Sequence, residues 1–154
     1  MTNVKDGLFE IALQPDKFES GYLNIPAIAG LEASLKYLTK LQSHGLSRYI
    51  NKLSKYLVQR LTEIDSLIIY GEPDENNTIF GFNLNPKDGI NCHDVSLFLD
   101  ESNIAVRSGV LCAHSLIQSI SDDGIIQVSI HAYNSLEDID RLVDTITVIA
   151  KELL

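Results

Sequence analysis

The residues best suited to chemistry lie in one stretch, from Arg107 to His114, whose sequence is Arg-Ser-Gly-Val-Leu-Cys-Ala-His. A guanidinium near a thiol can favour the thiolate, which is the nucleophilic form of cysteine. Gly109 allows a backbone turn that a residue with a Cβ would resist. Two interpretations of Cys112 follow: a reactive cysteine on a loop, or a small buried hydrophobe, which is commoner for a lone cysteine before an apolar run.

The other polar candidates give weaker signals. Cys92 is expected at a helix start beside Asp94, whose charge opposes a thiolate, whereas no acidic residue occurs between Arg107 and Gln118. We therefore expect Cys112 to be the more reactive thiol. The pair His93-Asp94 could be an acid and a base, but the start of a helix is the commoner reason for such a pair. No Cys/His spacing indicates a zinc site.

Composition narrows the class of protein. A chain of 154 residues with a formal net charge of −9 is one domain by length and is too acidic for nucleic-acid binding or for anionic membrane surfaces. No apolar run approaches the roughly 20 residues of a spanning helix, and the N-terminal residues lack the apolar core of a signal peptide. We expect a cytoplasmic protein with free thiols, with no nucleic-acid partner and no membrane partner.

Hydrophobic periodicity predicts the elements that position the cysteine stretch. Residues 1–24 form an irregular arm with one short extended piece. The expected strands are residues 67–70, 78–84, 104–106 and 125–130. Five helices are expected. The first begins near residue 28 and ends at His44-Gly45, the second runs from 46 to about 64, and the third begins at 92 or 93 with Asn91 as its cap. The fourth spans 113–120, and the fifth follows Ser135, which forms a capping box with Asp138.

This element order predicts an α/β or α+β fold with a mixed, mostly antiparallel sheet on which helices pack. The first helix carries an apolar stripe at Leu31, Leu35, Leu38 and Leu41, and the later helices carry similar stripes. The strand at 78–84 is expected to be buried on both faces. The helix near residue 92 is expected to bury Val95, Phe98 and Leu99.

Three segments resemble one enzyme family. The stretch from Arg107 to Ala113 closely resembles the active-cysteine loop of the Suf-type (group II) cysteine desulfurases, which belong to the class V aminotransferase family. Phe18-Glu-Ser-Gly21 with the following Asn24, and Ala132-Tyr-Asn-Ser135 with the acidic helix after it, match the family in the same order. The resemblance runs from about Gly7 to the C-terminus and covers only the last part of a full-length family member.

The resemblance implies the small C-terminal domain of the fold-type I pyridoxal-phosphate enzymes. Residues 1–24 would be an N-terminal arm and residues 25–154 a single domain, with the large cofactor-binding domain absent. The site residues that it implies are Cys112 as the catalytic thiol, Arg107, Asn24 and Gln127 at the substrate, and Gly21 and Tyr22 at the cofactor.

The chain also departs from the family pattern. Gln127 stands where the family has an arginine for the substrate carboxylate, and a neutral amide cannot make that bidentate ion pair. Tyr22 replaces a threonine that contributes to the cofactor phosphate across a dimer, Leu111 replaces a histidine, and Ser115 replaces a proline. No lysine of this chain stands in the His-Lys context of the family's Schiff base, so we expect the chain alone to bind no pyridoxal phosphate.

Three hypotheses about function follow. The chain could be the sulfur-accepting part of a truncated or split cysteine desulfurase, with a persulfide on Cys112 that serves iron–sulfur cluster assembly. Its partners would then be a separate large-domain subunit, a sulfur-acceptor protein and a second copy in a homodimer. It could instead be a non-enzymatic relative that binds a partner in sulfur metabolism, or a folded remnant without chemistry.

Overall fold

The computed structural model of this chain describes residues 3–5, 7–19, 21–72, 74, 76–85 and 90–153. It divides into two compact units, Met1–His44 and Gly45–Leu154. Each unit is described by itself below. The sequence Asn85-Pro-Lys-Asp-Gly89 predicts a turn, which lies mostly outside the described residues.

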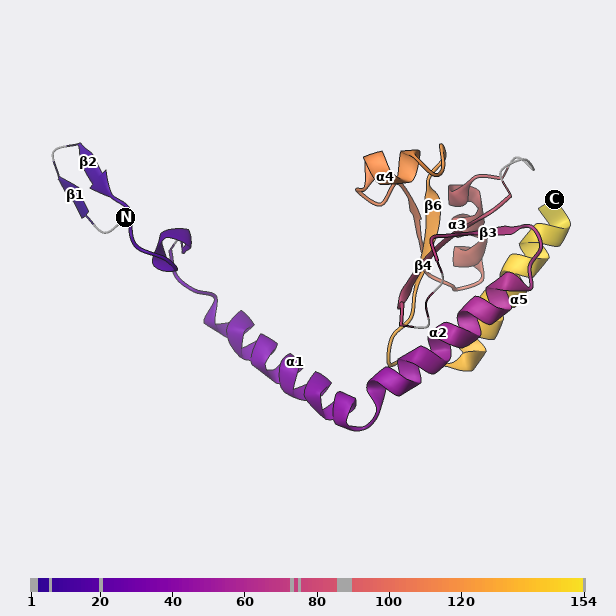
Figure 1. The fold of residues 1–154 in the computed structure, drawn as a ribbon, viewed down its shortest axis with the longest axis horizontal. Coiled ribbons are helices and arrows are strands. Elements are labelled where there is room, and N and C mark those ends of the chain that lie inside the picture. Colours follow the sequence, from indigo (N-terminus) through magenta and orange to yellow (C-terminus); the bar gives the residue numbers. More distant parts are fainter. Residues whose placement is uncertain are drawn as a thin grey trace. The chain divides into compact units, whose positions relative to one another are not determined.

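The first unit consists of a strand pair and one long helix. Strands β1 (Asn3–Lys5) and β2 (Leu8–Glu10) pair antiparallel, so the arm that was predicted to be irregular contains more regular structure than expected. A 3-10 turn, η1 (Asp16–Phe18), precedes helix α1 (Ile25–Ser43). Figure 1 traces these elements from the N-terminus.

Helix α1 begins three residues earlier than its apolar stripe predicts. The Asn24 side chain accepts a hydrogen bond from the backbone N–H of Ala27, and Pro26 occupies the first turn, where it suits a helix start. The helix ends as predicted, because Gly45 adopts the left-handed conformation with φ +92°. None of the described α1 residues is buried, and Leu31 and Leu35 of the stripe are exposed.

The second unit is built on a four-stranded antiparallel sheet with the order β3-β4-β6-β5. Every pairing in this sheet is antiparallel, which confirms the predicted mostly antiparallel fold. The strands are β3 (Leu67–Tyr70), β4 (Ile79–Leu84), β5 (Arg107–Gly109) and β6 (Ile125–Ser129). Strand β5 forms an edge of the sheet.

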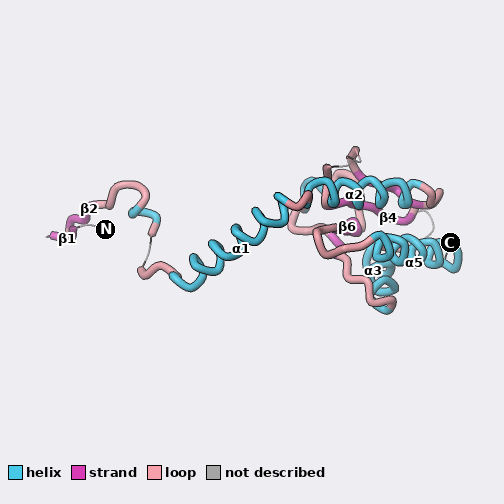
Figure 2. The backbone as a smooth tube through the Cα atoms, turned by 90° about the horizontal axis from the view of Figure 1, so that it is seen from below, coloured by secondary structure: helices cyan, strands magenta, loops and turns pink. Residues whose placement is uncertain are grey.

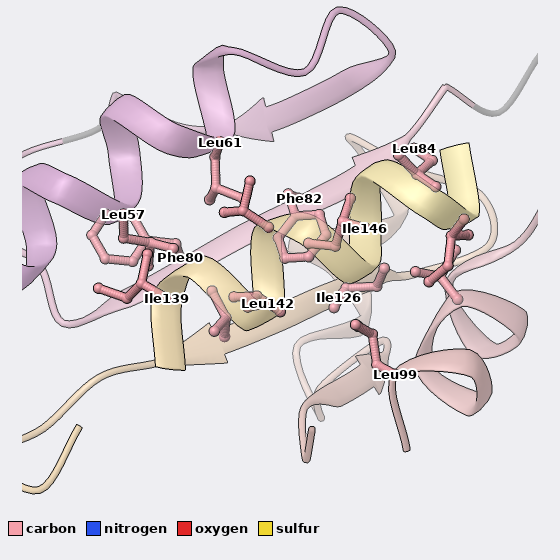
Figure 3. Packing of buried hydrophobic residues seen from close by; sticks show 14 of the residues in the cluster. Leu57, Leu61, Phe80, Phe82, Leu84, Leu99, Ile126, Ile139, Leu142 and Ile146 are labelled. Atoms are coloured by element: carbon pink, nitrogen blue, oxygen red, sulfur yellow. The ribbon is translucent and has the colours of Figure 1, made fainter. Parts of the chain in front are cut away.

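Helices cover one face of this sheet. They are α2 (Leu46–Thr62), α3 (Cys92–Glu101) and α5 (Leu136–Leu153), with the short α4 (His114–Gln118) after β5. Figures 1 and 2 show α2 and α5 side by side, and Figure 3 shows their leucines and isoleucines packed around the β4 phenylalanines. Phe82 and Ile126 lie opposite each other on adjacent strands and are both fully buried. Burying such side chains contributes about 2 kcal/mol each.

Helix α5 and the start of α3 match their predictions. The N–H of Ser135 donates to Asp138 Oδ2 at 3.0 Å, and the N–H of Asp138 donates to Ser135 Oγ at 3.2 Å, which confirms the capping box. Asn91 Oδ1 accepts from the N–H groups of His93 and Asp94, which confirms the predicted cap of α3. The stripe predicted for α5 also included Leu136, which is half-buried, and the rest of it is buried as expected, at Ile139, Leu142, Val143, Ile146 and Ile149.

Two local predictions are wrong. Residues 104–106 are not a strand, because the N–H of Ile104 turns back to the carbonyl of Leu99 and the sheet begins only at Arg107. Phe98 is 39% exposed, since the buried face of the short α3 is formed by Cys92, Val95 and Leu99. The prediction that the strand at 78–84 is buried on both faces holds for the second half of β4, since Phe80 and Phe82 are buried on one face and the polar Asn83 is buried on the other.

Among the residues that the structure describes, none of the helices combines the length and the apolar character that crossing a bilayer requires.

Candidate functional site

The candidate site is the loop between β5 and α4, in which two consecutive residues have left-handed backbone conformations. Leu111 has φ +54° and Cys112 has φ +60°, and Gly109 at the start of the loop has φ +105°. The N–H of Ala113 donates to the carbonyl of Val110 at 2.8 Å and closes the turn. This conformation leaves the Cys112 thiol exposed, as expected for a reactive-cysteine loop.

If Cys112 were a small buried hydrophobe, its thiol would pack against Leu111, Leu116 and Ile117. Leu116 is 64% exposed and Ile117 of the short helix α4 is buried, whereas Cys112 is exposed. The thiol is therefore not part of the described hydrophobic core, which contains Cys92 instead.

Arg107 and Gln127 lie directly opposite each other in the β5–β6 pairing. Side chains at paired positions of an antiparallel sheet share a face, with Cβ atoms about 5 Å apart. The structure thus brings together two residues that are 20 positions apart in sequence and that were both predicted at the substrate. Arg107 is exposed and Gln127 is half-buried. A role for either in substrate binding stays a prediction.

A shallow pocket adjoins the cysteine loop. Its described lining includes Cys112, Arg107, His93 and His114, together with the carboxylates of Asp122 and Asp123 from the turn before β6. The sequence between Arg107 and Gln118 contains no acidic residue, so the two aspartates in this lining come from a part of the chain that the local sequence did not indicate.

His93 contacts the base of the cysteine loop. Its Nδ1 lies 3.0 Å from Ser108 Oγ, and its Cε1 lies 3.1 Å from the position that a Cβ on Gly109 would occupy. A side chain at residue 109 would therefore press on the imidazole ring. The prediction that His93 and Asp94 mark a helix start is confirmed by the Asn91 cap.

Cys92 differs from Cys112 in every respect that controls reactivity. It is 3% exposed, and its Sγ donates to the carbonyl of Asp123 at 3.1 Å. Burial raises the pKa of the Cys92 thiol, the charges of Asp123 and Asp94 raise it further, and a hydrogen bond with the backbone of Gly109 partly opposes this. Cys92 is therefore a packed structural thiol.

The remaining predicted site residues, Gly21, Tyr22 and Asn24, belong to the first unit. Gly21 has φ +73°, and Tyr22 is fully exposed. The Asn24 side chain is used as the cap of α1. Their proposed contacts with substrate and cofactor stay predictions.

The pocket beside Cys112 does not fit pyridoxal phosphate by itself. A Schiff base needs a lysine, and the described lining of this pocket contains none. Asp122 and Asp123 would also repel the cofactor phosphate at this place. The lysine side chains that the structure describes are all exposed, at Lys17, Lys36, Lys40, Lys52, Lys55 and Lys151. No group of three or more metal-binding side chains occurs among the described residues.

A short-stranded antiparallel sheet under three helices, with an exposed cysteine on a loop at its edge strand, defines a small domain of the α/β class. The model of the aminotransferase class-V family matches residues 4–142 of this chain. The chain therefore belongs to the class V aminotransferase family.

The curated relatives are cysteine desulfurases. The cysteine desulfurase of Pectobacterium atrosepticum is 36% identical over 129 residues, which cover 84% of this chain and 31% of the relative. That of Haloferax volcanii is 34% identical over 140 residues, which cover 90% and 32% respectively. A probable cysteine desulfurase of Methanothermobacter thermautotrophicus is 36% identical, with 88% and 34% covered. The chain thus spans about a third of the length of the relatives that it matches.

Solved structures show the same fold. The apo cysteine desulfurase of Thermococcus onnurineus superimposes with a TM-score of 0.84 at 29% identity, over 98% of this chain and 37% of that structure. A cysteine desulfurase of Escherichia coli, solved with an S-sulfonic acid, superimposes with a TM-score of 0.83 at 23% identity, over 99% and 37%. Mixed α/β architecture with an antiparallel sheet is common to these structures and this chain.

Proposed function

We propose that this chain is the sulfur-carrying small domain of a Suf-type cysteine desulfurase and that Cys112 holds the sulfur as a persulfide. The observation that carries the proposal is the exposed Cys112 thiol on a strained loop beside Arg107, in a chain whose other cysteine is buried. A thiol that exchanges sulfur must be reached by its partner. The large domain and its pyridoxal phosphate would come from a part that the residues described here do not contain.

The transfer step proceeds without net oxidation. The Cys112 thiolate attacks the outer sulfur of a donor persulfide, a new S–S bond forms on Cys112, and the donor's S–S bond breaks so that the donor leaves as a thiolate. Arg107, which lines the same pocket, would attract an anionic persulfide donor, and Asp122 and Asp123 in that lining would weaken the attraction. A thiolate of an acceptor protein then attacks the outer sulfur of the Cys112 persulfide, and Cys112 leaves as a thiolate. We assign iron–sulfur cluster assembly as the destination of this sulfur.

The experiment presents the purified chain with a small persulfide such as cysteine persulfide and maps the sulfur by mass spectrometry of peptides. We expect one added sulfur atom on Cys112 in the natural chain and in the Cys92→Ser variant, and none in Cys112→Ser. Sulfur found on Cys92 alone, or on neither cysteine, would contradict the proposal.

The cofactor prediction is tested separately. Because the pocket of Cys112 contains no described lysine, treatment of the chain with pyridoxal phosphate and borohydride should trap no adduct. A stoichiometric adduct on a single lysine would show that this chain forms a Schiff base by itself. A large domain supplied in trans, together with a second copy of the complex in a homodimer, should be required before free cysteine is turned over.

A second candidate function is a non-enzymatic, partner-binding relative in sulfur metabolism. The observation that favours it is Gln127, which places a neutral amide opposite Arg107 where the family resemblance implies a second arginine. Stable binding of a sulfur-acceptor protein, with equal affinity for the natural chain and for Cys112→Ser, would favour this function. Absence of both binding and sulfur uptake would indicate a folded remnant.

A further inference from the structure

Asn83 is a buried polar side chain at the centre of several contacts. It lies on β4 and is 7% exposed, and among the described residues only Ser54 is a comparably buried polar side chain. Its Nδ2 group donates to the carbonyl of Gly124 at 2.8 Å, to Ser121 Oγ at 3.3 Å and to Tyr70 Oη at 3.2 Å. Its Oδ1 accepts from the N–H of Ile126 at 3.3 Å.

These contacts attach the Ser121–Gly124 turn to the sheet. Ser121 Oγ itself donates to the carbonyl of Gly124 at 2.7 Å, so the two ends of the turn are tied to each other as well as to Asn83. The Cys92 thiol donates to the carbonyl of Asp123 and holds the middle of the turn from the side of α3. Buried polar networks that are satisfied in this way are rigid and specify one arrangement.

The Ser121–Gly124 turn also contacts the base of the cysteine loop. Gly124 has φ +90°, and a Cβ there would lie 2.6 Å from the Cα of Gly109, so the two backbones are in direct contact. A Cβ on Gly109 would in turn lie 3.1 Å from Cε1 of His93. Gly109 is thus enclosed between two groups, three residues before the thiol of Cys112.

We propose that Asn83 is a positioning residue for the Cys112 loop. It acts through the Ser121–Gly124 turn, which presses on Gly109 and so restricts the backbone that presents the thiol. Its significance for sulfur transfer rests on the function proposed above, but its effect on the loop does not. Asn83 touches no reacting atom in this role.

The structure offers a matched pair of variants. Ser121→Ala removes the hydroxyl that links Asn83 to the turn, whereas Tyr70→Phe removes a hydroxyl that bonds the same amide from the side of β3. Each variant loses one contact of Asn83, and Ser121→Ala also loses the bond from Ser121 Oγ to the carbonyl of Gly124 inside the turn. Asn83→Ala removes the contacts of Asn83 and leaves that bond in place, so faster exchange in this variant shows the effect of the amide by itself. If Asn83→Ala does not fold, the pair still tests whether the turn, rather than the contact with β3, controls the loop.

The measurement is native-state hydrogen exchange of the Ala113 amide, whose bond to Val110 closes the cysteine loop. We expect Ser121→Ala to speed this exchange about fivefold or more, and Tyr70→Phe to change it less than twofold. Ser121→Thr keeps a hydroxyl and should restore slow exchange. Sulfur uptake by Cys112 should be slower in Ser121→Ala than in Tyr70→Phe and in the natural chain.

Equal effects of Ser121→Ala and Tyr70→Phe on the Ala113 amide, or no effect of either, would overturn the inference. Failure of the natural chain to take up sulfur would reject the proposed function alone, since loop exchange is measured without any sulfur donor. The two failures are therefore distinguishable.

Discussion

The difference in reactivity between the two cysteines can be tested directly. Limited alkylation with iodoacetamide, followed by peptide mapping, measures the rate at each thiol in the same sample. Cys112 is exposed and needs no structural change to react. Cys92 is 3% exposed and is bonded to the carbonyl of Asp123, so it reacts only when the start of α3 opens.

The size of the difference follows from the cost of that opening. Local opening of an element that belongs to the core costs about 3 kcal/mol, and each 1.4 kcal/mol is a factor of about ten. Opening alone therefore slows Cys92 by about 100-fold. Burial also raises the pKa of the Cys92 thiol, which lowers its thiolate fraction further. We expect Cys112 to be alkylated at least 100 times faster.

Two controls make the result interpretable. In Cys112→Ser, alkylation should become slow throughout the native chain, and in denaturant the two thiols of the natural chain should react at rates within a fewfold of each other. Modification of Cys92 first, or at a rate comparable to that of Cys112, would refute the reasoning from burial and would remove the main support for sulfur chemistry at Cys112.

Three further outcomes are expected. Burial raises the folded-state pKa of Cys92 above its ordinary value of 9.0. The stability that this thiol contributes is therefore complete below pH 9.0 and is lost as the pH rises through the folded-state pKa. In that pH range, urea titrations should show the unfolding free energy of the natural chain approaching that of Cys92→Ala. Gly124→Ala should lower the unfolding free energy by about 3 kcal/mol, against about 1 kcal/mol for Gly71→Ala, since both have positive φ but only the first Cβ meets a backbone; a similar loss in both would contradict this. Gln127→Arg places a guanidinium opposite that of Arg107, so it should lower the stability measured by thermal unfolding by about 0.5 kcal/mol. It should also strengthen the binding of small carboxylates once a large domain is supplied. Turnover of free cysteine with Gln127 intact would show that this position was misjudged.

The elements that could be predicted from sequence are those that depend on neighbours one helical turn away. The capping box of Ser135 and Asp138, the Asn91 cap and the buried stripe of α5 all have this character, and all are present. The strand placed at residues 104–106 failed because alternating β-branched residues do not determine where pairing starts. In the structure the pairing with β6 begins only at Arg107, opposite Gln127, because the N–H of Ile104 bonds the carbonyl of Leu99 at the end of α3.

The candidate site was predictable only in part, for the same reason. The glycine-containing loop could be inferred from local sequence, and the exposure of Cys112 from the family resemblance. The carboxylates of Asp122 and Asp123 enter its pocket only because the turn that carries them is attached to Asn83 on another strand. Gly124, which follows two aspartates and suggests a tight turn, was the one local signal that could have indicated this contact.

The left-handed conformation of Leu111 and Cys112 bears on any effort to make the chain more heat-resistant. An ordinary L-residue near φ +60° costs about 1 kcal/mol, and glycine or asparagine relieves much of it. Leu111→Gly is therefore an obvious substitution for an engineer who seeks durability. The same substitution would widen the range of directions in which the sulfur of the adjacent Cys112 points. Greater heat resistance and a defined orientation of the thiol therefore place opposite demands on residue 111.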